Sequence, residues 1–430
     1  MRTLMITGGA GFIGSNFVRF MLPRYPDLRV VVFDKLTYAG NPQNLSGLPE
    51  RFGDRYAFVQ GDIADPEAVR AVFRKHQPDG IANFAAATHV DRAILGAADF
   101  LRTDVHGTFI LLEAARTHGV ERYLQVSTDE VYGEVLQGSS RESDALAPRN
   151  PYSASKAAGD LMVLAYHHTY GLPVVITRGS NTFGPYQYPE KVLPLFVTNA
   201  LDDLPLPLYG NGRQVREWTH VQDHCAAIDL VLERGIPGDI YNVGSGERRE
   251  NIEVTHRVLG LLEKPASLIQ QVTDRPGHDP RYALDSSRVR ALGWRPERLF
   301  EEALEETVRW YQDREDWWRP LKVAPDYLEY YQRQYGARLA GGGQVLDLAQ
   351  DKKVVRQRPP RIRTKEQLEA ALARQRALWP PTQDPKKLAA EQGVKPIDWD
   401  TLPRDPDWSD EEHEEFLAWL YRSRRDGRDY

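Results

Sequence analysis

The sequence is poor in cysteine and contains no long apolar run. Its one cysteine, Cys225, excludes an intramolecular disulfide bond and argues against a cysteine-based zinc site. We interpret it as a small core residue of a protein in the reducing cytoplasm. No run of 18 apolar residues is present, which excludes a transmembrane helix. The net charge of −6 is mild and argues against a general nucleic-acid binder.

The sequence also lacks the common metal-binding patterns. It has 11 histidines and many carboxylates, but neither an HExxH motif nor an EF-hand spacing occurs, so we predict no metal. Glycines interrupt the N-terminal segment MRTLMITGGAGFIG where a signal peptide needs its apolar region. We therefore expect this segment to form a strand and turn of the mature fold.

The first 180 residues alternate apolar, β-rich runs with helical patterns. Most of the runs lack polar alternation, as strands do in a parallel sheet that is buried on both faces. We predict strands at Arg2–Thr7, Val30–Asp34, Tyr56–Asp62, Gly80–Ala86, Arg122–Thr128 and Val174–Arg178. We predict helices at Phe12–Leu22, Pro66–Lys75, Asp104–His118 and Ser153–Tyr170. This alternation indicates a doubly wound, Rossmann-type α/β fold.

The pattern changes twice further along the chain. After about Gly184, short strands mix with helices and loops, and we predict Pro207–Tyr209, Trp218–Val221 and Tyr241–Val243 as strands and Phe300–Trp310 as a helix. Beyond about Gln334, capping boxes at Thr364 and Ser409 predict two helices in an otherwise irregular stretch. We expect a cofactor domain of residues 1–183 with later segments interwoven, a smaller mixed α/β substrate domain of residues 184–333, and a mostly helical or irregular extension of unassigned role at residues 334–430.

Three glycines, Gly8, Gly11 and Gly14, follow the first strand and open the first helix. They permit a tight turn and the close approach of a pyrophosphate to the N–H groups of the helix start. Asp34 ends the second strand, where a carboxylate binds the ribose hydroxyls of NAD and repels the 2′-phosphate of NADP. Asp62 ends the third, where an acid meets the adenine. The alternatives are incidental glycines, a turn residue at Asp34 and a helix cap at Asp62.

Polar residues around the end of the fifth strand indicate a hydride-transfer site. Tyr152 and Lys156 lie on one helix face, where the cation lowers the pKa of the phenol and makes the phenolate accessible as a base. Their spacing alone arises by chance in a chain with 20 tyrosines, but their position after the fifth strand strengthens the prediction. Asp129 and Glu130 supply an acid and a base if the strand end curls into a loop, and a solvated turn is the alternative.

Together these features resemble the extended short-chain dehydrogenase/reductases, and within them the nucleotide-sugar 4,6-dehydratases, above all those that act on dTDP-glucose. The likeness runs almost continuously from Met1 to about Tyr330. It is carried by TGGAGFIGSNF, DKLTYAGN, HVDRAI, STDEVYGE, PYSASKAAGD, SNTFGPYQYPEKVLPL, PLYGNGRQVREW and DRPGHDPRYALD. The adjacent acids of STDEVYGE separate dehydratases from epimerases and decarboxylases.

The resemblance implies an NAD-dependent cycle without net oxidation. Tyr152 takes the proton of the sugar 4-hydroxyl while the C4 hydride goes to NAD. Glu130 then removes the C5 proton, which the new ketone acidifies, and Asp129 protonates the departing C6 hydroxyl. Acid and base must differ in environment to hold these states at one pH. Thr128 hydrogen-bonds the sugar near O4, Lys156 holds the nicotinamide ribose and tunes Tyr152, and a hydride returns to C6.

The resemblance also implies two binding sites. The cofactor site contains Gly8, Gly11, Phe12, Ile13, Gly14, Asp34, Lys35, Thr37, Asp62, Ile63, Ala85, Ala86, Thr103, Tyr152 and Lys156. The substrate site contains Thr88, Thr128, Asn181, Lys191, Val192, Tyr209, Arg216, Asn251, Arg275 and His278. The arginines and Lys191 suit a diphosphate. A surface ion pair is the alternative for either arginine alone, and a plain loop position is the alternative for His278.

The sequence departs from the family pattern at several positions, none of which is an assigned acid or base. These positions are Ala87, Thr88, Ala93, Asp104, Thr182 and Phe183. Two other functions stay open: 4,6-dehydration of a UDP- or CDP-linked hexose, and a non-catalytic NAD-binding scaffold.

We expect a homodimer formed through the helices at Asp104–His118 and Ser153–Tyr170, as the resemblance implies. We expect neither nucleic acid nor membrane as a partner. The predicted helix from Ser409 to Arg425 places several apolar residues on one side, which suggests a protein partner for the extension. Packing of this helix on its own catalytic domain or on the dimer mate is the alternative.

Overall fold

The computed structural model describes residues 1–340 of the chain. The two helices predicted from Thr364 and Ser409, with their suggested protein-binding side, lie outside the described residues. Within residues 1–340, no helix is long and apolar enough to cross a membrane. The same residues contain no group of His, Cys, Asp and Glu side chains placed to hold a metal ion.

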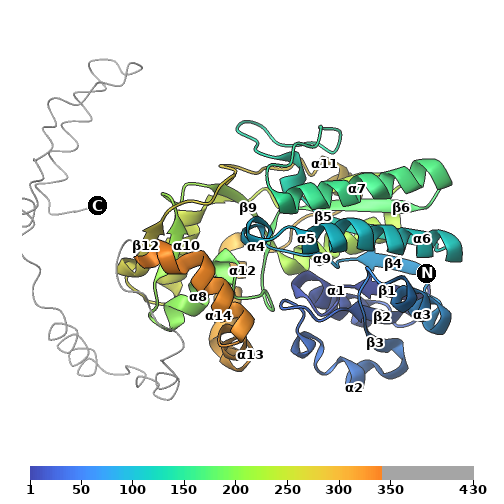
Figure 1. Ribbon diagram of the computed structural model, residues 1–430, viewed down its shortest axis with the longest axis horizontal. Helices are drawn as coiled ribbons and strands as arrows, with labels where there is room; N and C mark the ends of the chain where they lie inside the picture. Colours follow the sequence, from blue (N-terminus) through green and yellow to red (C-terminus); the bar gives the residue numbers. More distant parts are fainter. Residues whose placement is uncertain (341–430) are drawn as a thin grey trace, which may run out of the picture. The chain divides into compact units, whose positions relative to one another are not determined.

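A parallel sheet of seven strands forms the centre of the fold (Figure 1). Its order is β10-β6-β5-β4-β1-β2-β3. The strands are β1 (Thr3–Thr7), β2 (Arg29–Asp34), β3 (Tyr56–Gln60), β4 (Gly80–Asn83), β5 (Arg122–Thr128), β6 (Val174–Gly179) and β10 (Ile240–Val243). The predicted doubly wound fold is therefore confirmed. The strand order reverses between β1 and β4, and a ligand crevice is expected outside the carboxyl ends of the strands at such a point.

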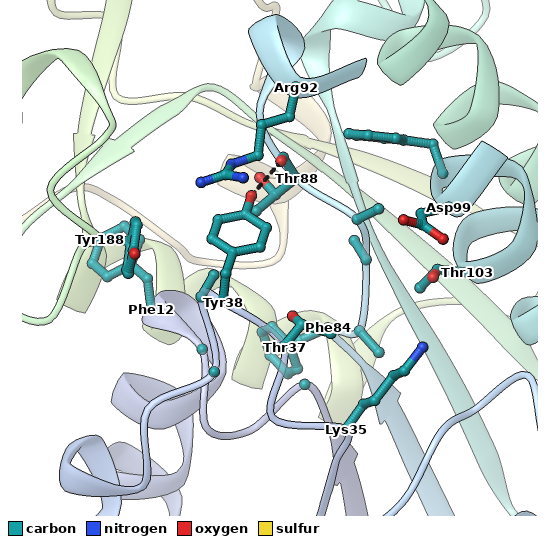
Figure 2. Close-up of a pocket in the computed structure, with 18 of the residues that line it drawn as sticks. Phe12, Lys35, Thr37, Tyr38, Phe84, Thr88, Arg92, Asp99, Thr103 and Tyr188 are labelled. Atoms are coloured by element: carbon teal, nitrogen blue, oxygen red, sulfur yellow. Dashed lines mark hydrogen bonds between the residues drawn. The ribbon is translucent and has the colours of Figure 1, made fainter. Parts of the chain in front are cut away.

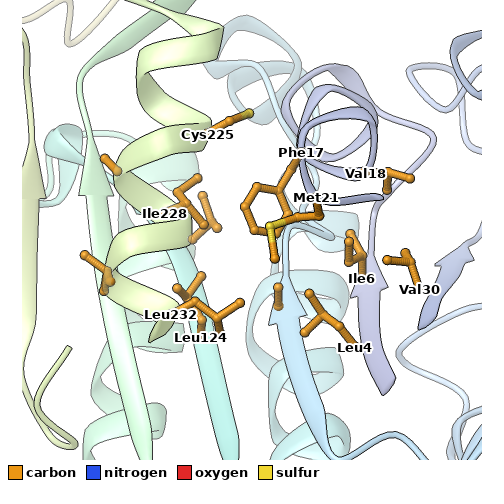
Figure 3. Close-up of a cluster of buried hydrophobic side chains, with 14 of the residues drawn as sticks. Leu4, Ile6, Phe17, Val18, Met21, Val30, Leu124, Cys225, Ile228 and Leu232 are labelled. Carbon is orange, nitrogen blue, oxygen red and sulfur yellow. The ribbon is translucent and has the colours of Figure 1, made fainter. Parts of the chain in front are cut away.

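Helices cover both faces of this sheet. The helices α1 (Phe12–Arg24) and α9 (Val221–Arg234) share one apolar cluster, to which α1 contributes Phe17 and α9 contributes Ile228 (Figure 3). The helices α3 (Pro66–His76), α6 (Thr108–His118) and α7 (Pro151–Tyr170) share a second cluster. Leu4 and Ile6 of β1 belong to the first cluster and Met5 to the second, because successive strand residues point to opposite faces.

Five further strands and several helices from the second half of the described chain build a smaller mixed region with its own aromatic core. Its strands are β7 (Asn181–Phe183), β8 (Leu206–Tyr209), β9 (Val215–His220), β11 (Arg248–Glu250) and β12 (Ile269–Val272). Its main helices are α8 (Val192–Leu201), α10 (Asn251–Leu261), α12 (Phe300–Asp313), α13 (Glu315–Lys322) and α14 (Pro325–Tyr331). Trp317, Trp318 and Tyr327 are fully buried in this core. Tyr335 and Leu339, which follow α14, pack into the same core.

Several element boundaries differ from the prediction. Strands β3 and β4 end at Gln60 and Asn83, so Asp62 and the residues at Ala85 lie in the loops beyond them. The helix predicted from Asp104 begins earlier, as the π-helix η3 (Leu101–Gly107) that runs into α6. Val221 starts α9 instead of ending a strand, because the ring of His220 accepts a hydrogen bond from the Gln222 N–H at 3.3 Å and caps the helix.

Candidate active site

A cavity of about 670 Å³ opens at the carboxyl ends of β1, β2 and β4, where the strand order reverses. Every residue predicted for the cofactor lines this cavity. They are Gly8, Gly11, Phe12, Ile13, Gly14, Asp34, Lys35, Thr37, Asp62, Ile63, Ala85, Ala86, Thr103, Tyr152 and Lys156. The structure thus brings together residues that lie up to 148 positions apart in the chain.

The glycines at the start of α1 form a cradle that side chains would fill. Gly8 has a φ of +65°, and a Cβ there would lie 2.6 Å from the backbone nitrogen of Ala85. A Cβ at Gly14 would collide with the carbonyl oxygen of Gly8. The helix start therefore presents bare backbone to the cavity, which fits the pyrophosphate of a dinucleotide.

The two acids predicted to meet the adenosine half both face this cavity. The carboxylate of Asp34 is fixed by two backbone donors, the N–H of Ala10 at 2.9 Å and that of Leu36 at 2.7 Å. Asp62 accepts from the N–H of Ala64 at 2.9 Å and forms an ion pair with Lys35 at 2.9 Å. Each group is held by local contacts before any ligand is bound, so the cavity fits NAD without rearrangement of these acids.

The end of β5 does curl, as the separation of Asp129 from Glu130 requires. Thr128 caps a single 3-10 turn, η4 (Asp129–Tyr132), and its hydroxyl accepts the N–H of Glu130 at 3.3 Å. The turn sends the two acids into different surroundings. Asp129 is 4% exposed, and burial, together with the neighbouring charge of Glu130, raises its pKa well above 3.8. Glu130 lines a second cavity instead.

Tyr152 and Lys156 stand on the first two turns of α7. Asn150 caps this helix through a reciprocal pair of hydrogen bonds with Ser153, which fixes where the helix begins. The ammonium of Lys156 donates to the carbonyl of Val126 at 2.8 Å. Burial and the facing carboxylates of Glu130 and Asp104 raise the pKa of Tyr152 well above 10. The pKa of this side chain is therefore raised, whereas the Tyr-Lys spacing predicts a lowered one, because burial and the nearby carboxylates both oppose ionisation.

A second cavity, of about 140 Å³, lies beside the first, and Gln187, Glu190 and Lys191 line both. Eight of the ten residues predicted for the substrate line it. They are Asn181, Lys191, Val192, Tyr209, Arg216, Asn251, Arg275 and His278. Thr88 lines the cofactor cavity, and its hydroxyl accepts from the ammonium of Lys191 at 3.1 Å. Thr128 lines neither cavity.

The second cavity is rich in buried cations. The guanidinium of Arg216 is buried and donates to the backbone carbonyl of Asp279 at 2.9 Å. Arg275 pairs with Asp91 at 2.8 Å. Burial lowers the pKa of His278 to about 4, so this ring is neutral at pH 7. Arg216 and Arg275 together suit a ligand that carries several negative charges.

A buried cluster around Arg92 was not predicted. Its guanidinium lies 3.7 Å from the ring centre of Tyr38 and 4.4 Å from that of Tyr330, and it pairs with Glu190 at 2.7 Å. Figure 2 shows it beside Tyr38, whose hydroxyl donates to the carbonyl of Thr88 at 2.7 Å. Arg92 belongs to the quoted segment HVDRAI, but the sequence did not predict the contacts of its side chain.

Two further residues near Glu130 were also missed. The side-chain amide of Asn150 and the hydroxyl of Tyr282 each lie 3.4 Å from the Oε2 atom of Glu130. Tyr282 also donates to Asp279 at 2.6 Å. Tyr282 falls inside a quoted segment and Asn150 directly precedes one, but only the folded chain shows that they meet this carboxylate.

Comparison with known proteins points in one direction. Residues 5–307 match the family model described as GDP-mannose 4,6 dehydratase. The dTDP-glucose 4,6-dehydratase of Streptomyces niveus is 48% identical over 328 residues, which cover 75% of this chain and 96% of the relative. That of Escherichia coli is 42% identical and is covered over 95% of its length by 74% of this chain.

Solved structures agree with these sequence matches. The dTDP-glucose 4,6-dehydratase of Streptomyces venezuelae, solved with NAD bound, is 51% identical with a TM-score of 0.72; the match covers 74% of this chain and all of the other. The enzyme of Bacillus anthracis in complex with NAD is 45% identical with a TM-score of 0.70, over 75% of this chain and all of the other. The chain therefore belongs to the dTDP-glucose 4,6-dehydratase family.

Proposed function

We propose that this protein catalyses the NAD-dependent dehydration of dTDP-glucose to dTDP-4-keto-6-deoxyglucose. The reaction oxidises C4, eliminates water across C5 and C6, and returns a hydride to C6. The observation that carries the proposal is the division at the end of β5, where Asp129 is buried and Glu130 faces the second cavity. Tyr152 and Lys156 line the adjoining cofactor cavity. The base and the hydride-transfer groups thus line two neighbouring cavities, and the buried acid directly precedes the base in the chain.

The surroundings of the two carboxyls match the roles that we assign to them. Burial raises the pKa of Asp129 well above 3.8, which favours the protonated form, and we assign this proton to the departing C6 hydroxyl. Its Oδ2 atom has no hydrogen-bond partner among the described residues and is left for that hydroxyl. Glu130 is oriented by Asn150 and Tyr282 and removes the C5 proton.

The cofactor cavity fits NAD. We assign the pyrophosphate to the glycine cradle at Gly8, Gly11 and Gly14, and the adenosine ribose to Asp34. When bound, NAD accepts the hydride from C4 and returns one to C6, and its oxidised ring is a cation that favours the phenolate of Tyr152. Tyr152 takes the O4 proton, Thr128 hydrogen-bonds the sugar near O4, and Lys156 holds the nicotinamide ribose.

The second cavity supplies the contacts for the nucleotide sugar. We assign the diphosphate to Arg216, Arg275 and Lys191, because buried guanidinium groups bind phosphate oxygens strongly. Asn181, Val192, Tyr209, Asn251 and His278 line the rest of this cavity and contact the sugar or the base, and Thr88 joins them through Lys191. The names of the relatives favour the thymidine nucleotide over the UDP- and CDP-linked hexoses.

A panel of nucleotide hexoses tests the assignment. We expect a 4-keto-6-deoxy product, detected by its absorbance in alkali, from dTDP-glucose and much less from UDP- or CDP-glucose. Turnover of a UDP- or CDP-linked hexose in its place would move the assignment to that substrate. NAD binding without any product would favour the non-catalytic scaffold.

The role of Glu130 needs a matched pair of variants. Glu130→Gln removes the proposed C5 base with little change in shape, whereas Glu121→Gln makes the same change at an exposed residue just before β5. We expect Glu130→Gln to lower kcat by roughly 10²-fold or more and Glu121→Gln to leave it unchanged. Equal activity of the two variants would show that Glu130 is not the base.

We also propose that the protein is a cytoplasmic homodimer. Leu101 on η3 and Leu161 on α7 are each 58% exposed, and Phe109 on α6 is also exposed. Neighbouring elements thus present bulky apolar side chains to solvent, as an interface does. Light scattering is expected to give twice the chain mass. Leu161→Glu is then expected to give a monomer, and a monomer in the unaltered protein would contradict the proposal.

The extension is the remaining candidate for binding a protein partner. We infer this from its predicted apolar helix between Ser409 and Arg425. Deleting residues 341–430 leaves Tyr335 and Leu339 in the described core. If the extension serves only a partner, turnover and oligomeric state are expected to stay unchanged. A fall in either would instead favour packing against the catalytic domain or the dimer mate.

A further inference from the structure

The proposed acid and base lie on the turn η4, whereas the proposed hydride-transfer pair lies on the helix α7. Elimination requires Asp129 and Glu130 to be placed correctly beside a sugar whose O4 contacts Tyr152. A misplacement of about 1 Å in such an arrangement can cost roughly 10²-fold in rate. The position of η4 relative to α7 therefore matters for the reaction, a requirement that rests on the proposed function.

Tyr132, the last residue of η4, is buried and joins this turn to the sheet. Its hydroxyl accepts a hydrogen bond from Nη1 of Arg178 on β6 at 2.9 Å and donates one to Oδ1 of Asn242 on β10 at 2.8 Å. The guanidinium of Arg178 also lies 4.9 Å from the centre of the Tyr132 ring. The ring shares a small apolar cluster with Ala157 of α7. These contacts fix the end of η4 against two strands.

Arg178 continues this connection to α7. Its Nε atom pairs with Oδ2 of Asp160 at 2.9 Å, and the two side chains are 2% and 0% exposed. Asp160 lies one helical turn beyond Lys156 and two turns beyond Tyr152, on the same face of α7. One buried guanidinium therefore links the turn that carries the acid and base to the helix that carries the hydride-transfer pair.

None of these three side chains can act on the substrate directly. Tyr132, Arg178 and Asp160 line neither the cofactor cavity nor the second cavity. Stability does not account for the ion pair either, because apolar residues of similar volume often replace a buried pair without loss of stability. A buried polar network with its partners in place does hold the elements that it joins in one arrangement.

A second polar contact between η4 and the start of α7 is longer. The side-chain amide of Asn150 lies 3.4 Å from Oε2 of Glu130, and this contact is only partly buried. The hydrogen bonds of the Tyr132 hydroxyl are shorter and buried. Among the described residues, they are therefore the stronger polar restraint on the turn.

We propose that Tyr132 is a positioning residue for the elimination of water. Through Arg178 and Asp160 it holds η4, with its acid and base, in register with α7. Loss of the Tyr132 hydroxyl loosens the end of η4 but leaves the side chains of α7 in place. Oxidation at C4 then continues, whereas the loss of water across C5 and C6 becomes slow.

The test follows NADH, because the cofactor is in its reduced form only between the oxidation of C4 and the return of the hydride to C6. Tyr132→Phe removes the hydroxyl and keeps the ring. When NAD-loaded enzyme is mixed with dTDP-glucose, we expect the NADH absorbance of this variant to build up and its kcat to fall about tenfold or more. Its affinities for NAD and for dTDP are expected to stay within about twofold of those of the unaltered protein.

Tyr241→Phe is the matched control. Tyr241 is buried on β10 in the apolar cluster of α1 and α9, and its hydroxyl accepts from the Ile236 N–H at 2.9 Å. This variant also loses a buried hydrogen bond, but on the face of the sheet away from α7. A denaturant titration compares the stability of the two variants, and Tyr241→Phe is expected to show no build-up of NADH. Glu130→Gln gives the reference for blocked elimination, with NADH accumulating.

Arg178→Lys is a second variant in case Tyr132→Phe does not fold. It keeps a cation beside Asp160 but replaces the forked guanidinium by a single ammonium, which does not reproduce both contacts. The same build-up of NADH is expected.

The outcomes separate the possibilities. A build-up of NADH in Tyr132→Phe and none in Tyr241→Phe supports the proposal. A build-up in both variants, a lower kcat of Tyr132→Phe without build-up, or an unchanged kcat overturns it. Absence of product from the unaltered protein overturns the proposed function instead.

Discussion

Ionisation of the buried Asp104 carboxyl lowers the free energy of unfolding, and a single substitution removes this cost. It is 1% exposed on η3, and its carboxylate accepts from the Ser155 hydroxyl at 2.7 Å and from the Ala87 N–H at 3.1 Å. Burial raises its pKa to about 6, against the opposing charge of Lys156. Among the described residues, the charge of Lys156 lowers the pKa of Asp104. The charge of Asp104 in turn raises the pKa of Tyr152.

The magnitude follows from the pKa in the two states. A carboxyl with a pKa of 3.8 when unfolded and about 6 when folded costs the folded state about 3 kcal/mol once it is ionised. Because the folded pKa is the higher one, the cost is absent below pH 3.8, grows as the pH rises, and is complete above pH 6. About half of it is present at pH 5.

Asp104→Asn is expected to remove this cost while keeping both contacts. The amide oxygen accepts from Ala87, and the amide nitrogen donates to the hydroxyl of Ser155. In denaturant titrations, the variant should therefore gain up to about 3 kcal/mol over the unaltered protein at pH 7.5 and about half as much at pH 5. The matched control is Asp99→Asn, an exposed acid on the preceding turn.

The same change is expected to act on catalysis. The Asp104 carboxylate raises the pKa of Tyr152 together with burial and Glu130, so its removal makes the phenolate easier to form. The ratio of kcat/KM between Asp104→Asn and the unaltered protein is expected to be near one below pH 5 and to rise through pH 6. A stability difference and a kcat/KM ratio that are both independent of pH would refute the reasoning.

Three further changes test other parts of the site. Gly14→Ala is expected to abolish NAD binding, measured by titration with the cofactor, because its Cβ would collide with Gly8, whereas Gly260→Ala, where a Cβ meets nothing, is expected to leave it unchanged. Asp34→Asn is expected to lower the preference for NAD over NADP, measured as the ratio of dissociation constants, by roughly tenfold or more. Asp91→Asn leaves Arg275 without its partner and is expected to raise KM for the nucleotide sugar about tenfold or more while NAD affinity is kept; a reversed pattern would place Asp91 in the cofactor site.

Residues whose function depends on local pattern could be predicted from the sequence. The glycine cradle lies between a strand and a helix that the sequence pattern predicts, so Gly8 and Gly14 could be placed without coordinates. Asp34 is similar, because it directly follows an apolar run whose residues are buried. Tyr152 and Lys156 share a helix face by their spacing alone.

Residues whose function depends on distant partners could not be predicted. Arg92 contacts Glu190, 98 positions away, and Tyr282 reaches Glu130 across 152 positions. No periodicity in the sequence predicts these contacts, since they depend on how the smaller region packs against the sheet. The π-helix η3 was missed for a related reason, because a π-turn and an α-turn share the same apolar pattern over so few residues.

The roles of Asp129 and Glu130 show where local pattern stops being sufficient. As neighbours on a strand they would point to opposite faces, and the residue types alone do not show which side chain is buried. The Thr128 cap resolves this by turning the chain at once, so that Asp129 is enclosed while Glu130 reaches the second cavity. The longer side chain, held by Asn150 and Tyr282, spans to the substrate as a base. The shorter one stays enclosed, where burial favours its protonated form and the Thr128 hydroxyl is its contact. The same threonine therefore sets the geometry of elimination, because it turns the chain and contacts the acid.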